Sequence, residues 1–175
     1  MRPVSPYAVA KSTSFWMTAN YRESYGIHAC TGLLSNHESP LRPARFVTSK
    51  IVNRIRAIKE GVQEYLELGN LNISRDWGWA PDYADAIFRI TSAEKPDDYI
   101  FATGSTHSLS DLIQGLCSLA GIDAAEVVRV NTLLLRPTDL ESVSLSPAKI
   151  KELLDWNPTT TFEQMLHKLL YKHLF

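Results

Sequence analysis

Apolar residues recur along this chain with two spacings, one typical of helices and one typical of buried strands. Repeats every three or four residues predict amphipathic helices over residues 6–25, 46–58, 81–90, 108–120, 147–156 and 161–170. Short apolar runs between turn residues predict strands at 27–34, 63–68, 99–102 and 127–130. Helices that alternate with buried strands are typical of a parallel sheet covered by helices, so the pattern predicts an α/β fold.

Local signals mark the ends of two helices. Ser5-Pro6 places a capping hydroxyl before a proline in the first turn, and Gly26 stops the same helix. Ser108, with Asp111 three residues later, predicts a capping box, and Gly121 ends that helix. These ends are therefore predicted independently of the apolar pattern.

Positive charge is concentrated in one segment. The formal net charge of the chain is -1, which gives no indication of nucleic-acid or membrane binding. Residues 42–59 nevertheless hold six basic residues and no acidic one. Such a run is either a solvated helix face or an anion site for a pyrophosphate or a 2′-phosphate. Arg42 and Arg45, in the loop before the predicted helix, are the better candidates for anion contacts.

The remaining composition fits a soluble cytoplasmic protein of 175 residues, either one domain or a lobe of a larger one. Cys30 and Cys117 lie in apolar contexts, and we expect both to be reduced. No apolar run is long enough to cross a bilayer, and no apolar leader follows Met1. The histidines are scattered, so we expect no metal site.

Tyr7 and Lys11 stand four residues apart, so a helix places one above the other. An ammonium held beside a phenol stabilises the phenolate, and such a pair can serve as an acid–base group near neutral pH. The same spacing also arises by chance in helices, so the pair by itself is a weak indication of catalysis.

Five short motifs follow one another along the chain. They are S-P-Y-x-x-x-K at 5–11, N-H-E-S-P at 36–40, F-V-T-x-K at 46–50, L-G-N-L at 68–71 and R-D-W-G at 75–78. With these motifs the chain resembles the GDP-mannose 4,6-dehydratase family of extended short-chain dehydrogenases/reductases, from Arg2 to at least Trp156. The aromatic and basic residues of 75–79 either pack at the edge of a core or contact a nucleotide.

The resemblance implies a partial Rossmann-type fold, with the late part of the parallel sheet followed by a small mixed substrate-binding lobe. Residues 1–36 are expected to hold the tyrosine–lysine helix and the last part of the dinucleotide-binding sheet. Residues 37–175 are expected to form mainly the sugar-nucleotide lobe, with returning strands. No glycine-rich dinucleotide turn occurs in the sequence. We therefore expect the carboxy-terminal half of such an enzyme, without turnover of its own.

The resemblance also implies a carbon–oxygen lyase activity. Members of this family convert GDP-mannose to GDP-4-keto-6-deoxymannose by internal hydride transfer through a nicotinamide cofactor, expected here to be NADP, with NAD as the alternative. A homo-oligomer, dimer or tetramer, is implied for the full-length family. Two other readings are open: another nucleotide-sugar dehydratase or epimerase of the superfamily, and a non-catalytic remnant or assembly subunit.

Individual residues take implied roles by their match to the family's motifs. Tyr7 and Lys11 match the catalytic pair, and both are implied to contact the cofactor. The other implied contacts are His37 and Arg42 with the cofactor, and Asn36, Lys50, Arg75 and Arg136 with the sugar nucleotide. The chain departs from the family at Leu41-Arg42-Pro43, where R-R-G is common, and this departure leaves both the NADP preference and a tetramer open.

Overall fold

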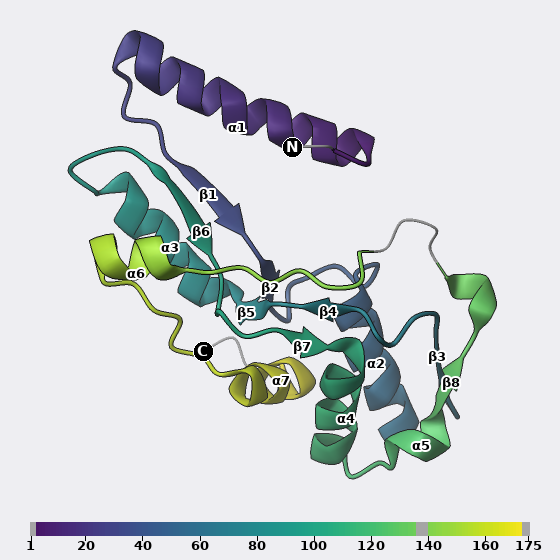
Figure 1. Ribbon diagram of the computed structural model, residues 1–175. Coiled ribbons are helices and arrows are strands. Elements are labelled where there is room, and N and C mark those ends of the chain that lie inside the picture. Colours follow the sequence, from purple (N-terminus) through teal and green to yellow (C-terminus); the bar gives the residue numbers. More distant parts are fainter. Residues whose placement is uncertain (1–2, 136–139, 173–175) are drawn as a thin grey trace.

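The computed structural model describes residues 3–135 and 140–172, so Arg136 lies outside the described residues. The helices are α1 (Pro6–Tyr25), α2 (Val47–Lys59), α3 (Ala80–Thr91), α4 (Leu109–Ala120), α5 (Ala124–Val127), α6 (Ala148–Leu154) and α7 (Phe162–Tyr171), with a 3-10 turn η1 (Thr132–Leu134). The strands are β1 (Thr31–Leu34), β2 (Asn36–Glu38), β3 (Leu66–Leu68), β4 (Ser74–Arg75), β5 (Trp77–Trp79), β6 (Asp98–Phe101), β7 (His107–Ser108) and β8 (Val128–Val130). Figure 1 shows α1 standing apart from the other elements.

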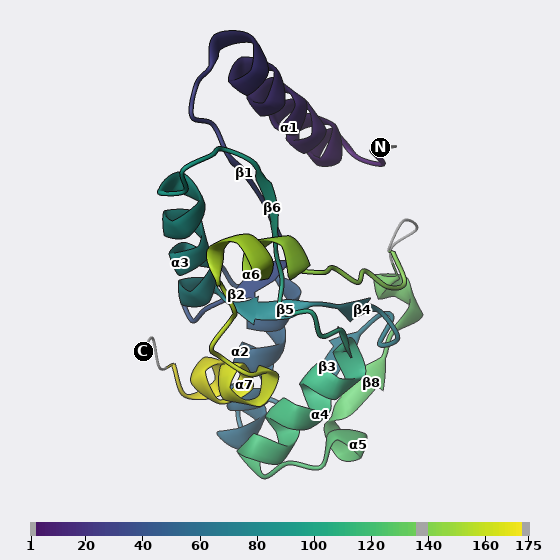
Figure 2. The ribbon, with the colours of Figure 1, turned by 60° about the vertical axis from the view of Figure 1, so that its left-hand side comes forward.

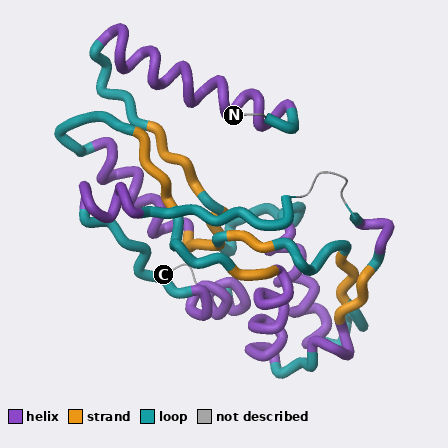
Figure 3. The backbone as a smooth tube through the Cα atoms, viewed as in Figure 1, coloured by secondary structure: helices purple, strands orange, loops and turns teal. Residues whose placement is uncertain are grey.

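Parallel pairing dominates the described strands. β1 pairs with β6, β2 with β5 and β3 with β8 in parallel, whereas β4 and β7 are antiparallel. The two strands of each parallel pair are far apart in sequence and are connected through helices, as parallel pairing requires. Figure 3 shows these short pairs distributed through the body of the molecule. This is the α/β architecture that the apolar pattern predicts.

The strand expected over 27–34 is shorter and more exposed than the sequence predicts. β1 begins only at Thr31. In register with β6, an earlier start would place Ala29 opposite Pro96, which has no N–H to donate. The two leucines of β1 are 38% and 36% exposed, and in the described residues only β6 pairs with this strand.

Two segments for which the apolar pattern predicts no strand of their own form short strands. The first three residues of N-H-E-S-P are β2, and R-D-W-G contributes to β4 and β5. Asn36 of β2 lies opposite Trp77 of β5. Strands of two or three residues are too short to show an alternating pattern, which is why the apolar pattern does not predict them.

Buried apolar side chains form two groups. The larger group lies among α2, α4, α7 and the strands β3 and β5, and includes Trp77 and Trp79. The smaller group lies between α3, β6 and the segment that contains α6 and Trp156. Figures 1 and 2 show α2, α4 and α7 grouped together, away from α1. None of the described helices has the length and apolar content needed to cross a membrane.

Asp76, between β4 and β5, is a buried carboxylate that joins the ends of two other strands. Its Oδ1 accepts hydrogen bonds from the Ser35 hydroxyl at 2.9 Å and the Thr103 backbone N–H at 3.0 Å. Its Oδ2 accepts from the Gly104 backbone N–H at 2.8 Å. Ser35 follows β1, whereas Thr103 and Gly104 follow β6, so Asp76 aligns the carboxyl ends of both strands with β5.

Close packing on one face of β5 requires a glycine at position 78. A Cβ atom there would lie 2.4 Å from the hydroxyl oxygen of Tyr83. That hydroxyl lies 2.5 Å from the Ser35 hydroxyl oxygen, and burial raises the pKa of the Tyr83 phenol above its usual range. The phenol therefore stays protonated in this contact at neutral pH, and Gly78 leaves it the space it needs.

α1 is the least buried of the longer helices. The Ser5 hydroxyl accepts a hydrogen bond from the Ala8 N–H at 3.1 Å, and Gly26 ends the helix with a φ of 64°, as the sequence predicts. None of the α1 residues is buried. The two Nη atoms of Arg22 each lie 2.9 Å from an oxygen of Asp98 on β6, and this ion pair links the helix to the body.

Replacing Asp76 by asparagine should destabilise the fold. An amide offers one acceptor oxygen in place of two, so at least one of the three donors loses its partner. An unpaired buried donor costs about 1–3 kcal/mol, and we expect the free energy of unfolding in urea to fall by that amount. Asp85→Asn is the matched control, because Asp85 is exposed on α3. Equal stability of the two variants would contradict the role of Asp76.

Replacing Asp98 by asparagine should loosen α1. The hydrogen bond from Arg22 lowers the pKa of the Asp98 carboxyl. The stabilisation from this pair is therefore present above the unfolded-state value of about 3.9 and is lost as the pH falls through the lower folded value. Spin labels on α1 and α3 should report a broader distance distribution for Asp98→Asn at pH 7, and for the wild type once the pH has fallen below the lowered pKa of Asp98 in the folded state.

Asp97→Asn is the control for this experiment, because the Asp97 carboxylate forms its ion pair with Lys149, whose Nζ atom is 2.6 Å away, and not with Arg22. An unchanged distance distribution in Asp98→Asn at pH 7 would show that other contacts hold α1.

Candidate functional site

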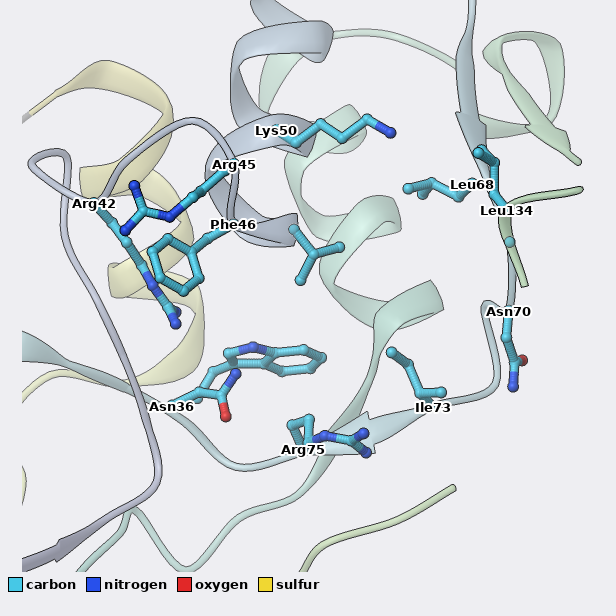
Figure 4. Close-up of a pocket in the computed structure, with 13 residues that line it drawn as sticks. Asn36, Arg42, Arg45, Phe46, Lys50, Leu68, Asn70, Ile73, Arg75 and Leu134 are labelled. Atoms are coloured by element: carbon cyan, nitrogen blue, oxygen red, sulfur yellow. The ribbon is translucent and has the colours of Figure 1, made fainter. Parts of the chain in front are cut away.

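A cavity of about 450 Å³ opens between the loop that follows β2, the start of α2 and the strands β3, β4 and β5 (Figure 4). Ligand pockets commonly measure roughly 300–1,000 Å³, so this volume suits a ligand of small-molecule size. Four basic side chains from three elements line the cavity: Arg42, Arg45, Lys50 and Arg75. The described residues that line it include no acidic residue, and the cavity is therefore cationic.

The rest of the lining combines amides with apolar and aromatic side chains. Asn36 and Asn70 provide the amides. The main apolar and aromatic side chains are Phe46, Leu68, Ile73, Trp77 and Leu134. This mixture suits a ligand with a flat apolar part, several hydroxyl groups and an anionic group.

The four motifs after α1 all contribute to this one cavity. N-H-E-S-P provides Asn36, F-V-T-x-K provides Lys50, L-G-N-L provides Asn70 and R-D-W-G provides Arg75. These segments belong to different elements and meet only in the folded chain. The motifs that were recognised separately in the sequence therefore describe a single site.

Strand register explains which motif residues reach the cavity. Residues opposite each other in a parallel pair point to the same face, so Asn36 and Trp77 share a face of the β2–β5 pair. Both line the cavity together with Lys50, which lies in the first turn of α2. In Figure 4 the Lys50 side chain extends from α2 toward Leu68, whereas Arg75 approaches from the opposite side.

One wall of the cavity depends on a close approach of two backbone segments. Gly69 follows β3, and a Cβ atom at this position would lie 2.7 Å from the Leu134 carbonyl oxygen. The Asn131 N–H donates to the Leu68 carbonyl at 2.8 Å and holds the two segments together. Only glycine allows this approach, which brings Leu134 into the lining.

Two of the cations have specific partners. The Arg42 guanidinium forms an ion pair with Glu38 and lies 4.2 Å from the centroid of the Phe46 ring. Burial raises the pKa of the Glu38 carboxyl, and the positive charge of Arg42 opposes this rise. Arg75 donates from Nη1 to the Ser74 carbonyl at 2.7 Å. Both guanidinium groups are thus oriented by the protein.

Tyr7 and Lys11 lie outside the lining of this cavity. The Lys11 Nζ atom is 5.7 Å from the centroid of the Tyr7 ring, so the two side chains share one face of α1, as the spacing predicts. Tyr7 is 72% exposed. The catalytic role of this pair stays a prediction from the family resemblance.

His37 and Arg42, both implied to contact the cofactor, do not share a site in this structure. Side chains alternate along a strand, so His37 points to the face of β2 opposite that of its two neighbours. Its Nδ1 lies 3.0 Å from the Ser35 carbonyl oxygen, and its ring centroid is 5.9 Å from that of Tyr83. A cofactor contact of His37 also stays a prediction.

Of the residues implied to bind cofactor or substrate, four lie together in the cavity: Asn36, Arg42, Lys50 and Arg75. Arg45, indicated only by the run of positive charge, lies there as well. The sequence assigned no role to Asn70 or Phe46, and their position within the motifs was the available signal. Trp77 belongs to the core and also lines the cavity, and its Nε1 has no hydrogen-bond partner within the described residues.

No cluster of three or more potential metal ligands occurs in residues 3–135 and 140–172. Cys30 and Cys117 are free thiols. The lining of the cavity offers cations, amides and aromatic surfaces for the recognition of a ligand.

Solved structures with similar folds include nucleotide-sugar dehydratases and epimerases. RMD from Pseudomonas aeruginosa, complexed with NADPH, superposes with a TM-score of 0.89 at 24% identity, over 99% of this chain and 57% of that one. A dTDP-glucose 4,6-dehydratase from Bacillus anthracis, in complex with NAD, gives 0.84 at 20% identity, over 98% and 52%. These similarities establish the predicted partial Rossmann-type fold.

Sequence relatives are more specific. The chain is 40% identical over 172 residues to GDP-mannose 4,6 dehydratase 1 of Arabidopsis thaliana, and 37% identical over 192 residues to GDP-mannose 4,6 dehydratase of Dictyostelium discoideum. These alignments cover 98% of this chain but 48% and 53% of the relatives, so the chain spans about half the length of the curated relatives it matches. Residues 1–169 match the family model described as GDP-mannose 4,6 dehydratase. The chain belongs to the GDP-mannose 4,6-dehydratase family.

Proposed function

We propose that this chain supplies the sugar-nucleotide side of a GDP-mannose 4,6-dehydratase. The observation that carries this proposal is the convergence of four family motifs on one cationic cavity. GDP-mannose is the proposed substrate, and a homo-oligomer is the proposed assembly. The activity is that of a carbon–oxygen lyase.

The charges in the cavity suit a diphosphate. Arginine guanidinium groups bind phosphate oxygens in a bidentate manner, and lysine adds a compact positive charge. Arg42, Lys50 and Arg75 reach the cavity from three different elements, so they can surround a diphosphate rather than contact it from one side. We propose that these three residues bind the diphosphate of the substrate.

The uncharged lining suits the remaining parts of a sugar nucleotide. Aromatic and aliphatic side chains such as Trp77 and Leu68 can cover the faces of a base. The amides of Asn36 and Asn70 can each donate and accept a hydrogen bond with base edges or sugar hydroxyls. We propose that this wall binds the nucleoside while the cations hold the diphosphate.

We also propose NADP, or alternatively NAD, as the cofactor, which accepts and returns a hydride when bound. The exposed face that Tyr7 and Lys11 share is accessible to the ribose and nicotinamide of such a cofactor. Lys11 would hold the ribose, and Tyr7 would accept a proton from the substrate hydroxyl. The family resemblance implies a cofactor contact for Arg42. Because Arg42 lines the cavity together with Lys50 and Arg75, we assign it to the substrate diphosphate instead.

Nucleotide binding tests the proposed site. Lys50→Met should weaken GDP binding by this 175-residue chain roughly 10-fold to 100-fold in isothermal titration calorimetry, because one charge-assisted contact is worth about 1.5–3 kcal/mol. Arg54→Met is the matched control, since Arg54 lies one helical turn later on α2 and does not line the cavity. Equal losses in the two variants would point to general charge attraction and contradict a specific site.

A panel of nucleotide sugars tests the substrate. Tighter binding of dTDP-glucose than of GDP-mannose would favour another nucleotide-sugar dehydratase or epimerase. Tighter binding of GDP-mannose would support the proposed substrate.

Turnover tests the catalytic pair. The sequence contains no glycine-rich dinucleotide turn, so we expect no 4-keto sugar from GDP-mannose with this chain alone. Co-expression with the part of the Arabidopsis relative that this chain does not match should allow turnover. Tyr7→Phe in that mixture should lower the rate about 100-fold or more, as expected for loss of a general acid–base group. Turnover by the chain alone would contradict our interpretation of the cofactor site.

A further inference from the structure

Glu38 is the fully buried acid beneath the cationic cavity. It lies at the end of β2, and its side chain has no exposed surface. A buried carboxylate is costly unless it is paired. In the described residues its Oε1 accepts from the Arg42 guanidinium, whereas Oε2 has no hydrogen-bond partner. The proposed diphosphate contacts do not use Glu38.

Arg42 is held at both ends. Its backbone N–H donates to the Ser39 carbonyl at 3.1 Å, and its carbonyl accepts from the Ser49 hydroxyl at 3.0 Å. Its guanidinium is bound to Glu38 and lies over the Phe46 ring. Its side chain is 20% exposed and lines the cavity. The backbone contacts fix the base of this side chain, and Glu38 fixes its tip.

A fixed guanidinium has a consequence for ligand binding. An arginine side chain loses rotamer freedom when it is immobilised, and a side chain that is already oriented does not lose that freedom again on binding. Glu38 engages one side of the planar group, and the guanidinium has five N–H donors in total. Donors remain for an anionic ligand.

We infer that Glu38 is a positioning residue, which holds the Arg42 guanidinium at the cavity in the orientation that contacts the phosphate groups of a nucleotide. This inference rests on the proposed function, because it assumes that a nucleotide occupies the cavity. Glu38 acts through Arg42 and has no contact with the ligand itself. A simple electrostatic role predicts the opposite effect, since a negative charge below the cavity would weaken anion binding.

Nuclear magnetic resonance of the ligand-free chain tests the orientation directly. The Arg42 Nε–Hε order parameter should be near 0.8 in the wild type and fall below about 0.6 in Glu38→Gln. Arg45 is the internal control, because its guanidinium lies 5.0 Å from the same Phe46 ring and should show no change. An Arg42 order parameter that is equal in both proteins would overturn the inference.

Titration calorimetry with GDP tests the consequence for binding. Glu38→Gln should weaken GDP binding about 10-fold, and Arg42→Met should weaken it at least as much. In the Arg42→Met background, Glu38→Gln should have less than about a 2-fold further effect, because Glu38 acts only through Arg42. Tighter binding by Glu38→Gln, or equal losses in both backgrounds, would overturn the inference.

Two further variants test whether Glu38 affects GDP binding through the position of its carboxylate rather than through its charge or through a loss of folding. Asp85→Asn removes the acid of another i,i+4 ion pair, the exposed pair with Arg89 on α3, and should leave GDP affinity unchanged. If Glu38→Gln does not fold, Glu38→Asp serves in its place, because it keeps the charge but withdraws the carboxylate by one methylene. Weaker GDP binding by Glu38→Asp supports positioning, and wild-type affinity overturns it.

The experiments also separate this inference from the proposed function. Absence of GDP binding by the wild-type chain would contradict the nucleotide site, and with it the ligand role of Arg42. GDP binding by the wild type, combined with an equally ordered Arg42 in Glu38→Gln, would contradict only the role of Glu38.

Discussion

The arrangement of the central strands depends on one buried carboxylate. Asp76 accepts hydrogen bonds from groups that follow both β1 and β6, which are distant in sequence. A buried carboxylate is tolerated only when donors satisfy it, so the ends of these strands must keep their positions relative to it. Arg75 and Trp77 flank Asp76 in the chain, and the part of the cavity that they line is subject to the same constraint.

Alternation along short strands distributes each motif over two environments. In N-H-E-S-P, Asn36 faces the cavity and His37 faces Tyr83. In R-D-W-G, Trp77 faces the cavity, whereas Gly78 makes room for Tyr83. Residues that are adjacent in a motif therefore serve recognition and packing in turn, and a shared motif does not imply a shared contact.

The helices were predictable because their signals are local. The capping box of Ser108 and Asp111 and the glycine stops at positions 26 and 121 have the expected geometry. The short strands were not predictable, because their pairing joins segments that are distant in sequence and their apolar pattern is too short to recognise. The family motifs carried information that periodicity lacks. They allowed four residues of the cavity lining to be named from the sequence as implied binding residues. The partnership of Glu38 with Arg42 has no sequence signal beyond their i,i+4 spacing.

The contact between Gly69 and Leu134 also constrains the order of events during synthesis. β3 and β8, which precede these residues, pair across a long intervening stretch that includes α3 and α4. Contacts of such high sequence separation form slowly, because loop-closure entropy must be lost first. During synthesis on the ribosome, the cavity wall that Leu134 forms is missing until β8 and the residues after it have emerged. Until then the nascent chain exposes Leu68 and its neighbours to water or to chaperones.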